Sequence, residues 1–224
     1  MAASRRFLGF SSRAGAIVVN LVGELIAPTR CAACDGAVRQ RSLFCAPCAS
    51  TIERAGAGDG RGTHVAAFEY GGAVATAIGR LKYEDRADLA PRLARAMAEA
   101  AQAFSGAIDL VVPVPLHPRR LAERGYDPAA LLAAPVARRL GVPSRPCALA
   151  RMRETPQQVV MDRASRLLNV AGAFAVREHT TVAGARVLLV DDVRTTGATL
   201  DGCARALHEV GARAVLALVL ARRA

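Results

Sequence analysis

The chain is poor in aromatic residues: among its 224 residues there are no tryptophans, three tyrosines and six phenylalanines. Proteins that bind single strands of nucleic acid on their own stack the bases on aromatic side chains, so this composition argues against autonomous strand binding. Lysine is almost absent too, since Lys82 is the single lysine among 30 basic residues. Hydrophobic residues make up 52% of the chain and charged residues 22%, which excludes an intrinsically disordered protein.

The charge of the chain is unbalanced. The 30 basic residues outnumber 19 acidic residues, and the formal net charge at pH 7 is +11. An excess of this size favours anionic partners, which are phosphorylated small molecules, nucleic acid or a membrane surface. The charge by itself does not identify a binding site.

An uninterrupted apolar run of membrane-spanning length is lacking near the N-terminus. Residues 14–28 are apolar, but Asn20 and Glu24 interrupt them, and the stretch is shorter than the roughly 20 residues that a spanning helix needs. Apolar residues at helical spacing predict an amphipathic helix that docks on its own domain or on a partner: Val18, Leu21, Val22, Leu25 and Ile26. Residues 4–10 (SRRFLGF) loosely resemble a twin-arginine export signal, with imperfect spacing. We expect a soluble, cytoplasmic chain without stable membrane insertion; a cleaved signal is the alternative.

Composition divides the chain into three parts. Residues 1–53 contain the apolar helix and a cysteine-rich segment, and residues 54–63 (RAGAGDGRGT) have the small, glycine-rich composition of a flexible linker. In residues 64–224 apolar strands alternate with helices. The predicted strands are 65–71, 108–115, 186–192 and 214–221, and the predicted helices are 73–104 (broken near 83–88), 129–140 and 198–210. Fully apolar strands in this alternation predict an α/β fold with a parallel sheet covered by helices on both faces.

The strongest chemical signal is VLLVDDVRTTGATL at residues 187–200. Four apolar residues run up a strand to Asp191 and Asp192, and a threonine-rich turn then opens a helix. A phosphate at the start of that helix meets free backbone N–H groups and the positive end of the helix dipole; its expected contacts are Arg194, Thr195, Thr196, Gly197, Ala198 and Thr199. The two carboxylates are placed to accept hydrogen bonds from ribose hydroxyls, and one of them could help to hold Mg²⁺. The alternative is a strand whose acidic residues merely cap the next helix.

Four cysteines form two Cys-x₂-Cys pairs: Cys31, Cys34, Cys45 and Cys48. Four thiolates at this spacing can hold a tetrahedral zinc ion, which stabilises a segment too short to have its own core. Disulfides are the alternative, disfavoured in a cytoplasmic chain, and a redox pair is a further one. We therefore predict structural zinc at these cysteines. Cys147 and Cys203 are expected to be small core residues.

Taken together, the chain resembles the ComF family, the competence protein F group, over residues 28–222. The matching segments are PTRCAACDG (28–36), CAPC (45–48), RLKYEDR (80–86), VVPVPLHPRRLAERGYD (111–127), RMRETPQQ (151–158) with Arg163 and Asn169, and the 187–200 segment. The resemblance implies a small zinc ribbon followed by a type I phosphoribosyltransferase-like domain. It also implies 5-phosphoribosyl 1-pyrophosphate (PRPP) as the ligand, taken together with Mg²⁺.

The resemblance also implies roles for three further groups of residues. Lys82 and Tyr83 are placed beside the active site, where Lys82 would act with Asp191 and Asp192 in catalysis; the alternative is that this single lysine survives by chance. A turn and the arginines after it would bind pyrophosphate, because guanidinium groups pair well with phosphate oxygens: Pro115, Leu116, His117, Arg119, Arg120 and Arg124. His117 could be an acid or base, or simply a surface histidine. A mobile lid would exclude water from a reactive sugar cation: Arg151, Thr155, Gln158 and Arg163.

One departure from the family pattern concerns the turn after Arg124. The family usually has Arg-Gly-Phe-Asn-Gln where this chain has Arg124-Gly125-Tyr126-Asp127-Pro128. The change removes amide donors and puts a carboxylate near the expected anion site, which places the usual role of that turn in doubt.

Two functions follow from the sequence. The first is an enzyme that transfers the phosphoribosyl group of PRPP to an acceptor that the sequence does not identify. The second is a non-catalytic adaptor that binds a nucleotide or single-stranded DNA and uses the ribbon for partner contacts. The resemblance implies a part in DNA uptake during natural transformation, with a helicase-like competence protein as partner.

Overall fold

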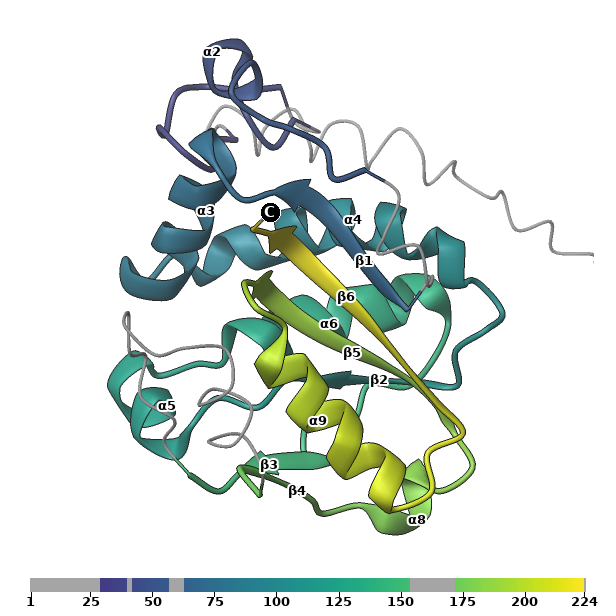
Figure 1. Cartoon of the computed structure of the whole chain (residues 1–224). Helices are drawn as coiled ribbons and strands as arrows, with labels where there is room; N and C mark the ends of the chain where they lie inside the picture. Colours follow the sequence, from purple (N-terminus) through teal and green to yellow (C-terminus); the bar gives the residue numbers. More distant parts are fainter. Residues whose placement is uncertain (1–28, 40–41, 57–62, 154–171, 224) are drawn as a thin grey trace, which may run out of the picture.

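A computed structural model describes residues 29–39, 42–56, 63–153 and 172–223 (Figure 1). Its centre is a four-stranded sheet in which every neighbouring pair of strands is parallel. In order across the sheet, the strands are β1 (His64–Glu69), β6 (Ala214–Arg222), β5 (Arg186–Arg194) and β2 (Leu110–Pro113). The four strands predicted from the sequence are these four, and their parallel arrangement is confirmed.

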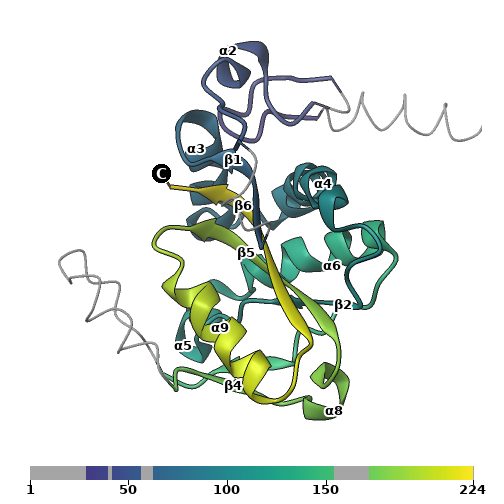
Figure 2. The same ribbon diagram turned by 45° about the vertical axis from the view of Figure 1, so that its right-hand side comes forward.

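Both faces of the sheet are buried. Along β5 the side chains alternate, so that Val187 and Leu189 enter one core whereas Leu188 and Val190 enter the other. Helices cover both faces, and Figure 2 shows two of those on the first face, α4 and α6, on the side of the sheet opposite to α9. The helices on the first face are α3 (Gly72–Tyr83), α4 (Ala90–Ala100) and α6 (Pro128–Leu140), and α9 is Ala198–Glu209. The expected cover on both faces is therefore confirmed.

Local sequence explains where the helices start and stop. Asp127 caps α6, since its carboxylate accepts the backbone N–H of Ala129 at 2.9 Å and that of Ala130 at 3.3 Å. The helix ends at Gly141, whose φ of 72° is the left-handed conformation that glycine tolerates. The break predicted near 83–88 is a turn that leads into a 3₁₀ segment, and a second 3₁₀ segment extends α4; these are Ala87–Leu89 and Ala101–Phe104.

Several short elements were not predicted. They are the antiparallel pair β3 (Leu149–Arg151) and β4 (Phe174–Val176), and the helices α2 (Ala46–Ala49), α5 (Pro118–Arg124) and α8 (His179–Val182). The β3–β4 pair lies at the foot of α9 in Figure 1 and shares a core with it. Cys203 is buried in this core as expected. Cys147 is exposed, contrary to the prediction, because it lies in the turn between Arg145 and Ala148 that precedes β3.

The cysteine-rich segment lies against α3 and α4 (Figure 2). Cys31, Ala32 and Phe44 are buried in the same core as the inner faces of these two helices. The chain then runs beside β1, where the N–H of Glu69 donates to the carbonyl of Glu53 at 2.9 Å. The ribbon therefore shares its core with the main domain.

Within residues 29–39, 42–56, 63–153 and 172–223, none of the helices combines the length and apolarity needed to cross a bilayer. The amphipathic helix predicted in residues 14–28 and the segment 4–10 fall outside the described residues. Three of the predicted lid residues do so as well: Thr155, Gln158 and Arg163.

Candidate active site and metal centre

The predicted ligand-binding segments meet at the carboxyl ends of β2 and β5. These strands are neighbours in register, with Pro113 opposite Val190. The N–H of Val114 donates to the carbonyl of Val190 at 2.9 Å, which ties the turn after β2 to the end of β5. In open parallel sheets, ligands bind at this edge. Tertiary structure thus brings residues 115–117 next to the 191–199 segment.

Two neighbouring acids on β5 diverge because successive side chains on a strand point to opposite faces. Asp192 points toward α3, where its carboxylate lies 2.6 Å from the ammonium of Lys82. Both side chains are largely buried, with exposed fractions of 11% and 21%. Asp191 points toward α9, where burial and, after it, the charge of Asp191 raise the pKa of the Cys203 thiol. The Asp191 carboxylate accepts the N–H of Asp192 at 2.8 Å. The structure therefore joins Lys82 to one acid of the pair and leaves the other nearer to α9.

The electrostatics of this acid pair are unusual. Burial and the charge of Asp192 raise the pKa of Asp191 to about 8, against the opposing effect of Lys82. Burial lowers the pKa of Lys82, but the charge of Asp192 outweighs it and the net shift is upward. At neutral pH, Lys82 is therefore charged while Asp191 is largely protonated. Strongly shifted carboxyl groups of this kind are typical of functional sites.

The turn after β5 is the segment that the sequence predicts to bind a phosphate. Gly197 has a φ of 85° and immediately precedes α9, which starts at Ala198. A glycine at this position has no side chain to cap the helix, so the first N–H groups of α9 face the turn. Thr195 and Thr196 are exposed beside it. Backbone donors and hydroxyls thus gather at one place.

Arg194 lies along this turn. A Cβ atom on Gly197 would come within 3.1 Å of the Arg194 Nε. That nitrogen is buried and has no hydrogen-bond partner in the described part of the chain. The side chain also lines a shallow hollow over β1 and β6 together with His64, Ala66 and Arg222. Arg194 is therefore adjacent to the predicted phosphate turn and has an unused donor.

The turn after β2 is held by Asp127. The N–H of Leu116 donates to the Asp127 carboxylate at 3.1 Å, and the same carboxylate caps α6. Burial and the charge of Asp192 raise the pKa of Asp127, although three backbone N–H groups oppose the shift. Asp127, which departs from the family pattern, thus has a structural role: its carboxylate holds the turn after β2 in place. Pro115 is buried, and His117 caps α5 by accepting the N–H of Arg119 at 3.3 Å.

Two of the three arginines expected to bind pyrophosphate contact neighbouring side chains. Arg119 is exposed and forms an ion pair with Glu123 at 3.1 Å along α5. Arg120 is half-buried. The guanidinium of Arg124 lies over the ring of Tyr83, 5.3 Å from its centroid. Of the predicted lid, Arg151 lies on β3 over the ring of Phe174, at 5.6 Å.

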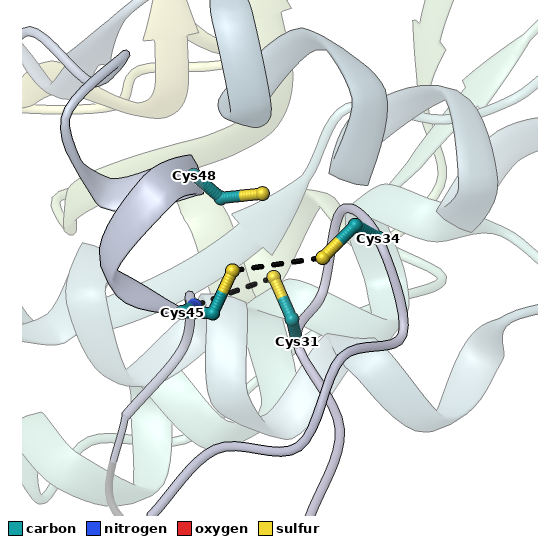
Figure 3. Close-up of side chains that lie close together, drawn as sticks. All are labelled: Cys31, Cys34, Cys45 and Cys48. Atoms are coloured by element: carbon teal, nitrogen blue, oxygen red, sulfur yellow. Dashed lines mark hydrogen bonds between the residues drawn. The ribbon is translucent and has the colours of Figure 1, made fainter.

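The four cysteines of the ribbon come together as predicted. Figure 3 shows their side chains directed toward a common centre, and all four Sγ atoms lie within 4.8 Å of one another. The Cys34 and Cys45 sulfurs are 3.6 Å apart, near the roughly 3.8 Å edge expected for four thiolates around zinc. Burial opposes ionisation of Cys31, but N–H groups of Cys34, Cys45 and Ala33 outweigh it and lower its pKa to about 6. The donor set therefore suits one tetrahedral metal ion.

Arginines of α3 and its neighbours connect this centre to the domain, and sequence reasoning missed them. Arg80 is buried, donates to the carbonyl of Ala33 at 3.2 Å and pairs with Asp35. Arg86 also reaches Asp35, at 2.8 Å. Because Arg80 lies two residues before Lys82, α3 links the cysteine centre to the acid pair. The one available signal was the clustering of basic residues in RLKYEDR.

Comparison with known proteins agrees with this architecture. Residues 127–224 match the family model described as the phosphoribosyl transferase domain. The DNA utilization protein YhgH of Salmonella typhimurium is 31% identical over 205 residues, which cover 86% of this chain and 89% of that protein. YhgH of Escherichia coli K12 is 30% identical over the same extents. Competence protein F of Haemophilus influenzae is 33% identical over 115 residues, 51% of this chain and 50% of that protein.

A solved structure, purine phosphoribosyltransferase from Pyrococcus horikoshii, is 18% identical and aligns with 58% of this chain and 71% of its own, with a TM-score of 0.37. A similarity at this level carries no argument about activity. The YhgH matches span most of both chains at about 30% identity, and the domain match and the cysteine cluster agree with them. The chain therefore belongs to the ComF family, with a parallel phosphoribosyltransferase-type sheet preceded by a four-cysteine segment.

Proposed function

We propose that the chain binds PRPP or a related ribose 5-phosphate ligand at the carboxyl ends of β5 and β2. One observation carries the proposal: β5 leads Asp191 and Asp192 directly into the left-handed Gly197 turn at the start of α9. The 5-phosphate would lie on the N–H groups of that turn, with the Thr195 and Thr196 hydroxyls and the unused donor of Arg194. The ribose hydroxyls would form hydrogen bonds with the carboxyl groups of Asp191 and Asp192.

In the enzymatic form of the proposal, a nucleophile attacks C1 of the ribose as the bond from C1 to the pyrophosphate oxygen breaks. Pyrophosphate would leave toward the turn at 115–117, where Arg120 and Arg124 supply positive charge. Mg²⁺ commonly binds phosphate oxygens and only one or two carboxylates, which fits a site with Asp191 and Asp192 at its edge. The ion would neutralise charge on the leaving group.

The raised pKa of Asp191 gives this residue a specific part. A neutral carboxyl group can donate a hydrogen bond to a ribose hydroxyl in the ground state. As positive charge develops at C1, a nearby carboxylate becomes more favourable, so the acid pair would stabilise the transition state more than the ground state. Lys82, paired at 2.6 Å, would hold the Asp192 carboxyl group in place throughout.

Calorimetry with PRPP and Mg²⁺ tests the binding, and an assay for released pyrophosphate tests turnover. We expect the wild type to bind and Asp191→Asn to bind at least about tenfold more weakly. Asp109→Asn is the matched control, because Asp109 precedes β2 at the opposite edge of the sheet. Absence of PRPP binding by the folded wild type would contradict the ligand assignment. If PRPP binds but no pyrophosphate is released with any base or amine tested as acceptor, the binding site is supported and the enzymatic form of the proposal is contradicted.

We propose that the cysteine centre holds one structural zinc ion. Four thiols in a closed set leave no open position for a substrate, so the ion would stabilise the ribbon and would not take part in the reaction. Metal analysis of the natively purified chain should give about one zinc per chain, and Cys48→Ser should abolish it. The exposed Cys147, changed to Ser, is the control and should leave the metal content unchanged. A metal-free native chain would contradict the proposal.

A second candidate function is a non-catalytic adaptor in DNA utilization or uptake, acting in the cytoplasm with single-stranded DNA and a helicase-like protein. The observations in its favour are the names of the relatives and the net charge of +11. The two functions differ in one measurement: an adaptor binds PRPP or a nucleotide without releasing pyrophosphate. Its strand binding would weaken steeply with salt, whereas binding of the ribose phosphate would depend on Asp191.

A further inference from the structure

The first turn of α3 is capped by the cysteine ribbon. The hydroxyl of Thr51 accepts the N–H of Ala73 at 3.0 Å, one of the N–H groups that the start of a helix leaves without a partner. The same hydroxyl donates to the carbonyl of Cys48 at 2.8 Å, so the cap continues into one of the four thiol residues. A Cβ atom on Gly72 would collide with the carbonyl oxygen of Thr51, so the ribbon approaches α3 as closely as a glycine allows.

The ribbon holds α3 a second time, near its other end. Asp35 directly follows Cys34, and its N–H donates to the carbonyl of Cys31 at 3.1 Å, so it belongs to the turn that carries the first cysteine pair. Its carboxylate pairs with the buried Arg80 in the last turn of α3, and with Arg86 just beyond the helix at 2.8 Å. Each of the two cysteine pairs thus holds one end of the same helix.

Helix α3 is also the element that brings a cation to the acid pair. Lys82 lies two residues after Arg80, and its ammonium is 2.6 Å from the carboxylate of Asp192. A binding site works only when its groups are held within roughly 0.5 Å of the productive geometry, and a helix transmits a displacement of its ends along its whole length. The contacts that hold the two ends of α3 therefore set where Lys82 lies.

The two cysteine pairs are joined to each other mainly at their sulfur atoms. The Cys34 and Cys45 sulfurs are 3.6 Å apart, and the N–H of Cys45 donates to the Cys31 sulfur at 3.4 Å. Hydrogen bonds to sulfur are weak, whereas one tetrahedral ion would bond to all four thiolates. The ion would therefore fix the two pairs, and with them both attachments of α3, relative to each other.

We propose that Thr51 and Asp35 are positioning residues of the ribose phosphate site, and that α3 makes ligand binding and metal binding at the cysteine centre depend on each other. The proposal rests on the proposed function, because it concerns the regulation of that same site. The two states are a metal-bound ribbon that holds both ends of α3 and a metal-free ribbon whose cysteine pairs move apart and loosen them. Coupling between two binding sites is reciprocal, so each ligand must strengthen the other by the same factor.

Calorimetry with ribose 5-phosphate on the zinc-loaded full chain tests the first part. Asp35→Asn should bind it about fivefold or more weakly than wild type. Asparagine tolerates the left-handed backbone of this position, where φ is 59°. Asp109→Asn is the matched control, because that carboxylate is also paired with an arginine and is similarly exposed, 43% against 40%, but lies at the opposite edge of the sheet. Its affinity should not change.

The cap at the start of α3 gives an independent variant. Thr51→Val keeps the shape of the side chain but removes the hydroxyl that joins Ala73 to Cys48, so ribose 5-phosphate binding should weaken. Thr51→Ser keeps the hydroxyl and should bind like wild type. A loss in Thr51→Ser equal to that in Thr51→Val would contradict the role of the cap.

The reciprocal measurement is the zinc affinity of the full chain, determined by competition with a chelator. Saturating ribose 5-phosphate should tighten zinc binding to wild type by the factor by which zinc tightens ribose 5-phosphate binding, and Asp35→Asn should bring that factor close to one. A wild type whose zinc affinity is the same with and without ribose 5-phosphate overturns the inference, as do equal losses of ligand affinity in Asp35→Asn and Asp109→Asn. In both cases the proposed function stands. If wild type binds neither ribose 5-phosphate nor PRPP, the proposed function fails and the inference fails with it.

Discussion

At the two ends of the parallel strands, which form the amino edge and the carboxyl edge of the sheet, the pKa values of buried or paired carboxyl groups are shifted in opposite directions. At the amino edge, Asp109 pairs with Arg186 at 2.7 Å and also accepts its backbone N–H at 2.8 Å, and these contacts lower the pKa of Asp109 to about 2. At the carboxyl edge, burial raises the pKa of Asp191 to about 8 and that of Asp127 as well. Strand β5 begins with Arg186 and carries Asp191 near its end, so one strand contributes to both edges.

This difference supports the carboxyl edge as the proposed binding site. Pairing at the amino edge stabilises the fold, as an ordinary surface ion pair with extra hydrogen bonds does. The carboxyl edge instead gathers Asp127, Asp191 and Asp192, where burial and neighbouring charge raise the pKa values of Asp127 and Asp191, a local arrangement that works against stability. Natural proteins accept such conflicts mainly at functional sites.

The largest effect on stability is expected from removing Lys82, the cation at the carboxyl edge, and we compare it with removing Arg186, the cation at the amino edge. Lys82→Met leaves the buried Asp192 without its partner and should lower the free energy of unfolding by about 3 kcal/mol, whereas Arg186→Met removes a more exposed pair and should cost much less. Urea denaturation at pH 7 measures both. The double variant Lys82→Met with Asp192→Asn should recover most of the loss. Equal losses for the two single variants would contradict the comparison.

The pH dependence of stability should have opposite signs at the two edges. The folded-state pKa of Asp191 lies above its ordinary value of 3.8, so its stabilising contribution is complete below pH 4 and is lost as the pH rises through 8. Asp191→Asn should therefore be more stable than wild type at pH 9, with the gap closing toward pH 4.

For Asp109, whose pKa is lowered, the stabilising contribution is present above pH 4 and is lost as the pH falls through 2. Asp109→Asn should be less stable than wild type at pH 7, and the two proteins should converge near pH 2. Thermal or urea unfolding across this range checks both variants. Parallel pH profiles for the two substitutions would show that the edges do not differ.

The link between the ribbon and the carboxyl edge can be tested at Arg80. Arg80→Met removes the buried donor to the carbonyl of Ala33 and leaves Asp35 with its contact to Arg86, and it should cost about 2 kcal/mol of stability. It should also weaken ribose 5-phosphate binding through α3, which carries Lys82. The control is Arg95→Met on α4, whose exposed pair with Glu99 at 3.6 Å should be worth at most about 0.5 kcal/mol. If Arg80→Met binds ribose 5-phosphate as tightly as wild type, the cysteine centre and the acid pair are not coupled through α3.

The smallest stability difference is expected between two glycines in the left-handed conformation. Gly197 at the carboxyl edge and Gly211, which precedes β6 at the amino edge, have φ values of 85° and 86°. Alanine at either should cost about 1 to 2 kcal/mol because of the backbone conformation. A Cβ meets Arg194 Nε at 3.1 Å only at Gly197, with open space at Gly211. Ribose 5-phosphate binding should therefore fall in Gly197→Ala and persist in Gly211→Ala.

Periodicity alone predicted the elements that carry the core. The stretches 108–115 and 186–192 became β2 and β5 because a strand buried on both faces must be apolar throughout. The break predicted near 83–88 is the end of α3. The pair β3–β4 escaped prediction because each strand has three residues and its partner lies far along the chain. Short apolar segments of this kind carry no periodic signal.

The sequence indicated the residues of the candidate site but not the long-range contacts between them. Asp191, Asp192 and Gly197 stand in one uninterrupted segment, and the structure keeps them at the start of α9. Asp127 raised doubt because its carboxylate was expected to repel a ligand; the structure gives it three backbone N–H groups, a role that depends on where the Leu116 turn runs. No sequence pattern indicates such a long-range partner.

The sequence by itself determined the strands, the glycine turn, the two adjacent acids and the four thiols, because each is a local pattern of polarity and spacing. Tertiary structure alone decided that Lys82 pairs with Asp192 and not with Asp191, and that the pKa of Asp191 rises. It also decided that Arg124 lies over an exposed Tyr83. The reason is that burial and charge pairing depend on which distant segments meet, and a strand sends neighbouring side chains to opposite faces.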